Sequence, residues 1–255
     1  MCGRFALTLP PEAVRELMGY IDQPNFPPRY NIAPTQPVPV VTLDAGARRF
    51  VLMRWGFLPS WVKDPKDFPL VFNIRSESAA EKPAFRNALK RRRAIMPADA
   101  FYEWKKEGKQ SVPFLIRKPG GGGFGFAALW ETYSAPDGSE IDTVAILTTS
   151  ANATTAPIHP RSPVILQPEQ YSLWLDPETP AGAAQALLRP PPTDFLEAVP
   201  IGAEINKVAN DNPDVQRPAA PDELWAPPST SRRAPRPAPA AKGPKAPPDD
   251  QGSLF

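Results

Sequence analysis

The sequence predicts an α+β fold with a mainly antiparallel, barrel-like β-sheet core and peripheral helices, followed by a disordered C-terminal tail. Three observations support this fold class. Short runs rich in β-branched and aromatic residues, which are typical of strands, outnumber the helical patterns. Strand and helix signals do not alternate regularly, which argues against a doubly wound parallel sheet. The final part of the chain is dominated by proline.

The strongest strand signals are runs of β-branched and aromatic residues bounded by Pro, Gly or Asp. They lie at 38–43, 48–57, 113–118, 124–133 and 141–150.

Helical patterns are fewer. Apolar residues recur at helical spacing in 11–21, directly after two prolines. Segments 80–92 and 168–176 carry similar patterns. We therefore expect three helices, placed around the sheet rather than between successive parallel strands.

The C-terminal part of the chain has a different composition from the rest. There are 11 prolines between Pro213 and Phe255 and few large apolar side chains. Such a segment buries too little surface to offset the entropy of ordering it. We therefore predict a domain over 1–212, a proline-rich disordered linker over 213–250 and a separate short motif over 251–255.

Composition and charge narrow the class of protein. The single cysteine excludes an internal disulfide, which fits a reducing compartment. No apolar stretch approaches the roughly 18 residues of a membrane span, and no signal peptide is visible. We expect a cytoplasmic protein with no membrane contact. The net charge of +2 excludes little, because local clustering of charge matters more.

The lone cysteine, Cys2, directly follows the initiator methionine. Removal of Met1 would leave a 1,2-aminothiol, whose amine and thiol both have usable neutral or anionic fractions near neutral pH. An aldehyde condenses with such an amine to an imine, and the thiol then closes a five-membered thiazolidine. The alternative is a chance cysteine in a flexible arm.

Two further segments carry candidate chemistry. Asn73 and Arg75 alternate with apolar neighbours and are predicted to share one face of a strand, while Glu103 lies between aromatic residues that would suit it to proton transfer. Residues 81–93 hold six Lys or Arg against one Glu, as expected for a solvated helix face or for contact with a phosphate backbone. The alternative for Glu103 is an ordinary exposed strand residue.

The only histidine, His159, lies between prolines and is a candidate acid or base, although a lone histidine is more often structural. Arg161 suits a phosphate or a carboxylate. Trp61, next to a proline turn, is either a core residue or a ring on which a base stacks.

Six segments taken together resemble the SOS-response-associated peptidase family, whose members are abasic-site processing proteins. They are MCGRF (1–5), RYNIAPTQ (29–36), RWGFLPSW (54–61), FNIRSES (72–78), MPADAFYEWKK (96–106) and IHPRSPVIL (158–166). The resemblance runs from residue 2 to about Asn210. FNIRSES and IHPRSP depart slightly from the family pattern but keep its polar residues.

The resemblance implies a thiazolidine crosslink between the N-terminal cysteine and the ring-opened abasic site in single-stranded DNA, shielding the lesion at replication forks. It makes Cys2 the nucleophile and gives Asn73 the task of holding the amino terminus or the sugar. Glu103 and His159 become acid/base groups. The implied DNA contacts are Arg4, Arg75 and Arg161 for phosphates, with Pro34 and Trp61 as hydrophobic surfaces that bend the DNA. No metal or cofactor is implied, a monomer suffices, and the protein would be nucleoid-associated.

Residues 251–255, QGSLF, resemble the short peptide by which bacterial proteins dock on the replication sliding clamp. Leu254 and Phe255 would fill a pocket, Gln251 would complete the motif, and an extended linker would give reach. The alternative is a chance match, because the motif is short.

Two other classes of function remain open. N-terminal-cysteine hydrolases, either peptidases or glutamine amidotransferases, also need Cys2 exposed by loss of Met1, whether by an aminopeptidase or by self-cleavage. A non-covalent single-strand binding module would leave the cysteine incidental, so that Cys2→Ala would not change DNA binding.

Overall fold

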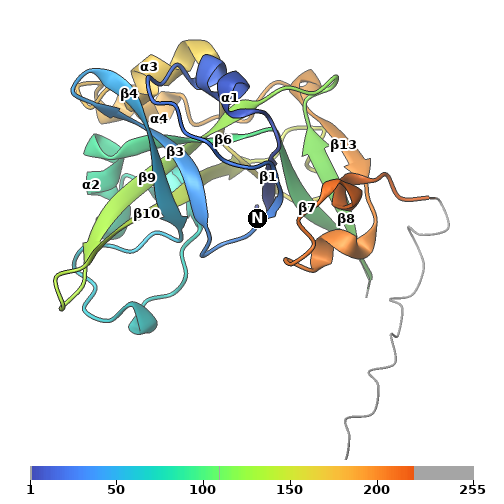
Figure 1. Cartoon of the computed structure of the whole chain (residues 1–255), viewed down its shortest axis with the longest axis horizontal. Coiled ribbons are helices and arrows are strands. Elements are labelled where there is room, and N and C mark those ends of the chain that lie inside the picture. Colours follow the sequence, from blue (N-terminus) through green and yellow to red (C-terminus); the bar gives the residue numbers. More distant parts are fainter. Residues whose placement is uncertain (1, 109, 221–255) are drawn as a thin grey trace, which may run out of the picture. The chain divides into compact units, whose positions relative to one another are not determined.

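The computed structural model describes residues 2–108 and 110–220, so the predicted clamp motif lies outside the described residues. Two β-sheets form the fold, and the helices lie around their outside (Figure 1). The predicted α+β class with a barrel-like core is confirmed. No helix within the described ranges is both long enough and apolar enough to cross a membrane.

Five strands of the larger sheet close into a barrel. Around the ring, β10 pairs with β4, β4 with β3, β3 with β6, β6 with β9, and β9 again with β10. Their bounds are β3 Pro37–Asp44, β4 Ala47–Trp55, β6 Arg93–Ala98, β9 Phe124–Ser134 and β10 Glu140–Ser150. The barrel interior holds the main hydrophobic core. Closure pairs the two outer strands of the ring with each other, so they do not present open sheet edges to solvent.

Short strands extend the barrel at β10 and β9. Strand β5 (Asn73–Arg75) runs parallel to β10, while β11 (Arg161–Pro163) runs antiparallel to it. Strand β12 (Ile165–Leu166) pairs with β9. The parallel β4–β10 and β5–β10 pairings are a departure from a purely antiparallel sheet, and they arise because the chain leaves and rejoins the same edge of β10.

The smaller sheet has the strand order β13–β8–β7–β1–β2. Its strands are β1 Phe5–Leu7, β2 Arg29–Ile32, β7 Ala100–Glu107, β8 Gln110–Arg117 and β13 Glu197–Pro200. The predicted runs at 38–43, 48–57, 113–118, 124–133 and 141–150 correspond to β3, β4, β8, β9 and β10. The turn between β3 and β4 has positive φ at both Ala45 and Gly46, the conformation that a two-residue hairpin requires.

The helices follow the predicted segments with shorter bounds. Helix α1 (Pro11–Met18) ends before the predicted residue 21 because Gly19 adopts a left-handed conformation with φ 70° and closes the last turn. Helix α2 (Pro83–Arg91) begins at a proline, which suits the first helical position. The predicted third helix is a 3₁₀ turn followed by α3 (Tyr171–Leu175), and α4 (Ala181–Ala186) was not predicted.

The ordered chain continues beyond the predicted boundary at residue 212. Residues Pro213–Gln216 form a 3₁₀ turn, and Val215 within it is 1% exposed. Its side chain packs in a second core on the outer face of the smaller sheet, together with Ile201 and Ile205. The buried Val215, the bridge between Ile201 and Pro218 and the hydrogen bond from Gln216 to Tyr102 together hold this segment on the smaller sheet, whereas its composition alone predicts disorder.

Candidate functional site

Cys2 lies three residues before β1, the strand that pairs with both β7 and β2, and it is fully buried. The amide of Tyr102 donates to the carbonyl oxygen of Arg4 at 3.0 Å. Continuing this antiparallel register along β7 places Glu103 level with Gly3, next to the cysteine. Sheet pairing therefore brings the predicted nucleophile and the predicted carboxylate together.

The Cys2 thiol is held in its protonated form. Burial, and after it the negative charge of Glu103, raise the pKa of the thiol well above its usual range. The Sγ atom donates to the carbonyl oxygen of Arg4 at 3.6 Å. Glu103 itself is only 5% exposed, so the thiol and the carboxylate share a site with little solvent.

Asn73 approaches Cys2 from the barrel. Its side-chain nitrogen Nδ2 donates to the backbone carbonyl oxygen of Cys2 at 2.8 Å. In β5 the intervening Ile74 is buried and Arg75 is exposed, which fits the predicted strand. The Oδ1 atom of Asn73 is buried and accepts no hydrogen bond from any described residue, so it can accept one from a nearby amine or hydroxyl.

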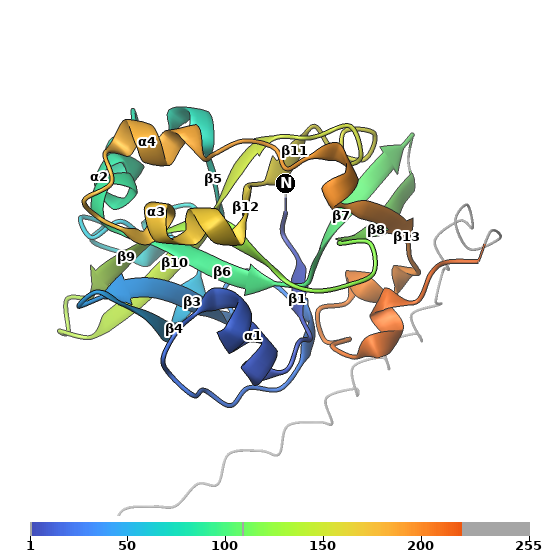
Figure 2. The same cartoon turned by 90° about the horizontal axis from the view of Figure 1, so that it is seen from above.

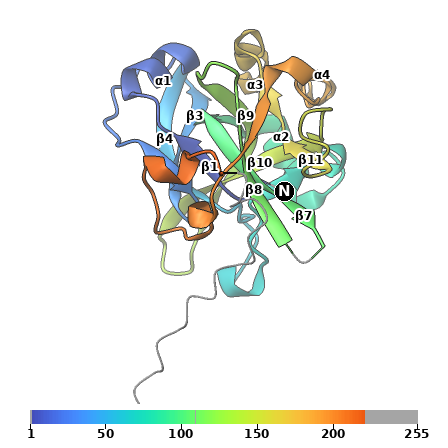
Figure 3. The same ribbon diagram turned by 90° about the vertical axis from the view of Figure 1, so that its right-hand side faces the viewer.

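His159 lies two residues before β11 and is half-buried. Its Nδ1 atom is 3.0 Å from both the backbone nitrogen and the backbone oxygen of Arg161. The neutral ring accepts from that N–H, and the doubly protonated ring donates to that oxygen, so either charge state has a partner. Figures 2 and 3 both show the first described residues beside β7, the strand that contains Glu103, and beside β11, the strand that follows His159.

Arg161 forms a two-pronged ion pair with Glu77. The two guanidinium nitrogens donate to the two carboxylate oxygens at 2.6 and 2.9 Å, and the same group reaches the backbone oxygen of Thr148 at 2.6 Å. Because β5 and β11 pair with opposite edges of β10, this contact crosses the strand and ties them together. Sequence reasoning missed Glu77, which lies in the 3₁₀ turn Ser76–Ser78 directly after β5, where strand alternation gives no signal.

The predicted phosphate contact Arg4 is engaged in packing between secondary-structure elements. Its guanidinium donates to Asn31 Oδ1 at 2.7 Å and to the backbone oxygen of Ile205 at 2.9 Å. It also lies over the Trp104 ring. By contrast, the side chain of Arg75 is exposed, and its guanidinium makes no hydrogen bond or ion pair with another residue of the described ranges.

The basic cluster of 81–93 divides into two kinds of side chain. Arg93 is 3% exposed and donates to backbone oxygens of Leu89 and Trp174, and Arg92 forms an ion pair with the buried Glu131. The side chains of Lys82, Arg86, Lys90 and Arg91 are exposed along α2. Only part of the predicted charge excess is therefore available to an anionic partner.

The two predicted hydrophobic contacts lie near the end of β4. Trp61 is 63% exposed and meets the edge of Phe68 in the long loop between β4 and β5. Pro34 is half-buried in the β2–β3 turn, where the amide of the next residue, Thr35, donates to the backbone oxygen of Trp55 at 2.7 Å. Both belong to segments that leave the same end of the barrel.

Within the described parts of the chain, no group of three or more His, Cys, Asp or Glu side chains is arranged to hold a metal ion. The fold and the site define a closed-barrel α+β protein that buries the thiol of its second residue against an amide and a carboxylate.

The sequence pattern of the SOS response associated peptidase (SRAP) family matches residues 1–208. The chain is 36% identical over 220 residues to Abasic site processing protein YoqW of Bacillus subtilis, covering 84% of this chain and 98% of that one. It is 28% identical over 260 residues to Abasic site processing protein HMCES of Xenopus tropicalis, covering 84% and 77%. The chain belongs to the SOS response associated peptidase family, as its motifs predicted.

Solved structures share the fold. A protein from Bacteroides thetaiotaomicron matches with a TM-score of 0.79 at 24% identity, over 86% of this chain and all of that one. A protein from Bordetella bronchiseptica matches with a TM-score of 0.68 at 27% identity, over 79% and 99%.

Proposed function

We propose that this protein senses abasic sites in single-stranded DNA and captures them covalently through Cys2 after Met1 is removed. Relatives that the chain covers over most of their length are named abasic site processing proteins. The single observation that carries the chemistry is the convergence of Asn73 and Glu103 on Cys2, from two different sheets.

The proposed reaction needs no redox step and no cofactor, and it releases one water. The neutral α-amine of Cys2 attacks C1′ of the ring-opened sugar, and loss of one water gives an imine. The thiol then adds to the imine carbon, forming the C–S bond, and its proton passes to nitrogen. The product is a thiazolidine ring.

Each neighbouring residue has a task in this proposal. The protonated thiol needs a base at the moment of C–S bond formation, and Glu103 is the carboxylate whose charge reaches it. Asn73 fixes the Cys2 carbonyl and offers Oδ1 to the amine. His159 is proposed to protonate the sugar oxygen as the ring opens, and Arg75 to contact a phosphate. Arg161 gains a phosphate only by leaving Glu77.

A raised thiol pKa is easier to reconcile with this proposed function than with hydrolysis by a cysteine nucleophile. A peptidase or an amidotransferase needs a thiolate that attacks an amide directly, and this requires a lowered thiol pKa. Here the pKa of Cys2 is raised. In the crosslinking reaction the amine attacks first, so a protonated thiol is compatible with the first step.

The test uses a uracil-containing single strand treated with uracil glycosylase, followed by denaturing electrophoresis. Wild-type protein should give a shifted band, and Cys2→Ala should give none. Cys2→Ser is the matched control because it keeps the amine and removes only sulfur: it should form a bond seen only after borohydride reduction. A shifted band of wild-type yield from Cys2→Ala would contradict the proposal.

We also propose that residues 251–255 bind the bacterial sliding clamp. The sequence QGSLF supplies two adjacent apolar anchors and a glutamine, after a proline-rich stretch. Docking there would bring the protein to replication forks, where single strands are exposed.

A further inference from the structure

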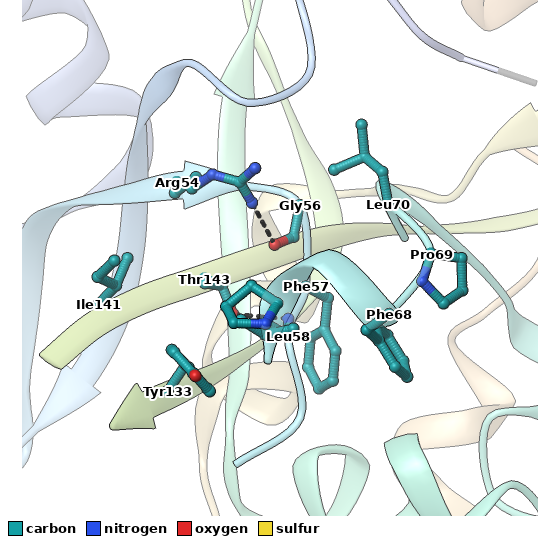
Figure 4. A pocket seen from close by; sticks show the side chains of 11 residues that line it. Arg54, Gly56, Phe57, Leu58, Phe68, Pro69, Leu70, Tyr133, Ile141 and Thr143 are labelled. Atoms are coloured by element: carbon teal, nitrogen blue, oxygen red, sulfur yellow. Dashed lines mark hydrogen bonds between the residues drawn. The ribbon is translucent and has the colours of Figure 1, made fainter. Parts of the chain in front are cut away.

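The molecule has a pocket that the proposed chemistry does not use. It has a volume of about 220 Å³ and lies at the base of the loop between β4 and β5. Figure 4 shows Tyr133 and Ile141 of the β9–β10 hairpin on one side of it and Phe68 and Leu70 of the loop on the other. Phe57 adds a third aromatic ring to the lining.

Exposed apolar side chains gather around this pocket. Of the seven large hydrophobic residues exposed in the described chain, two line the pocket, Leu70 at 46% and Ile141 at 44%. The parallel register of β4 and β10 places Leu52, 60% exposed, beside Ile141. Trp61 contacts the lining residue Phe68. Clustering of this kind marks a binding surface, whereas scattered exposed residues need no explanation.

The pocket also carries one positive charge. Arg54 is half-buried in its wall and donates to the backbone oxygen of Gly56 at 3.2 Å. No ion pair within the described residues neutralises Arg54. An occupant with an apolar ring and an attached negative charge would match both the lining and this guanidinium.

The pocket and Asn73 of the proposed reactive centre both adjoin β10. Thr143 lines the pocket, and Ile146, three residues further along β10, pairs with Asn73. Three residues of strand span about 10 Å. At the roughly 3.4 Å rise of each strand in B-form DNA, that length corresponds to about three nucleotides, and a more extended single strand covers it in fewer.

We propose that this pocket binds one nucleobase of the DNA strand that carries the abasic site, within about three nucleotides of it, with Arg54 on the adjoining phosphate. The proposal rests on the proposed function, because it needs single-stranded DNA at Cys2. The pocket would be a second DNA-binding position: the abasic sugar reacts at Cys2, while an intact nucleotide nearby places its base in the pocket.

The experiment combines removal of single bases from the DNA with truncation of single side chains in the protein, and compares the binding affinities of all combinations. Non-covalent binding is measured with single strands that carry tetrahydrofuran, a non-reactive analogue of an abasic site, at the central position. Each strand of the series carries a second tetrahydrofuran at one of the four positions on either side of the centre. In wild-type protein, one position should show a penalty of roughly 5- to 150-fold, the usual contribution of a stacked base. That penalty should fall at least threefold in Leu70→Ala.

Leu173→Ala is the matched control, because Leu173 is 45% exposed on α3 and Leu70 is 46% exposed. It should keep the full penalty, and Ile141→Ala should repeat the result of Leu70→Ala. The proposal is overturned if no pocket variant reduces the loss of affinity on base removal, or if base removal lowers the affinity at no position. Crosslinking of an aldehyde-containing strand is measured in parallel: a normal wild-type crosslink with no pocket-dependent position rejects only the pocket, and an absent crosslink rejects the proposed function.

Discussion

The side-chain amide of Asn73 donates to the backbone carbonyl oxygen of Cys2, 2.8 Å away. Asn73 opens β5 on the barrel, whereas Cys2 precedes β1 of the smaller sheet. This one hydrogen bond therefore holds the start of the chain at the junction of the two sheets. In the proposed reaction, an amine there would be placed by backbone on one side and by a side chain on the other, which would limit its freedom before the substrate arrives.

We expect Asn73→Ala to lower the free energy of unfolding by about 1 kcal/mol, the usual net contribution of one hydrogen bond. Crosslinking should slow by about 5- to 10-fold, since the Cys2 carbonyl loses its donor. Denaturant titration and a crosslinking time course measure the two effects. Asn87→Ala, at an exposed position on α2, is the control and should change neither. An unchanged rate in Asn73→Ala would remove Asn73 from the site.

The buried thiol predicts a dependence of stability on pH. In the unfolded chain the Cys2 thiol has a pKa near 8.5, and in the folded protein burial raises it. Above about pH 8.5 the unfolded chain loses a proton that the folded protein keeps. The free energy of unfolding therefore has its full value below that pH and falls as pH rises, with a slope approaching about 1.4 kcal/mol per pH unit.

Burial also raises the pKa of tyrosines such as Tyr20 and Tyr171, so the test must isolate the cysteine. Cys2→Ser removes a group that titrates in this range and changes little else in volume. Denaturant titrations between pH 7 and 10 should give curves that diverge above pH 8.5, with the wild type losing more stability. Parallel curves would show that the thiol is not desolvated.

Local patterns predicted the strands and helices that have strong sequence signals, and they missed elements whose position depends on the rest of the fold. Strands β3, β4, β8, β9 and β10 carry β-branched runs, whereas β1 and β5 are three residues long and exist because longer strands pair with them. The pairing of β4 with β10 closes the barrel between segments far apart in the sequence. The hydrophobic periodicity of a single segment does not predict such a pairing.

The site shows the same division. The types of Cys2, Asn73, Glu103 and His159 suggested chemistry, and the family motifs suggested their roles. Their positions depend on tertiary structure: whether an arginine faces DNA or another element is not visible in the sequence. Arg4 and Arg161 were both predicted as phosphate contacts, yet their guanidinium groups meet Asn31 and Glu77.

The ion pair of Glu77 with Arg161 gives a prediction in which two measurements change in opposite directions. Glu77→Gln removes a negative charge beside the site, so non-covalent affinity for single-stranded DNA should rise about twofold at low salt. Crosslinking should slow several-fold, because β5 with Asn73 and β11 next to His159 lose the contact that ties them together. Glu77→Asp keeps the charge and should restore most of the rate.

Glu197→Gln is the matched control, because Glu197 forms an exposed ion pair with Arg117 in the smaller sheet. It should leave the crosslinking rate unchanged. The stability of both variants should fall by less than about 1 kcal/mol, as is usual for surface ion pairs. Equal rates for Glu77→Gln and wild type would show that the pair does not position the site.

The proposed clamp motif predicts a separation of binding from chemistry. Replacing both Leu254 and Phe255 by alanine removes the apolar anchors, so binding to a purified bacterial sliding clamp should fall by at least tenfold in a surface-immobilised assay. Asp249→Ala with Asp250→Ala is the control, since it changes neighbouring residues outside the motif and should keep clamp binding. Both double variants should crosslink an abasic single strand at the wild-type rate, because the reactive residues lie within 2–159. Clamp binding that survives loss of both anchors would show that QGSLF is not a docking motif.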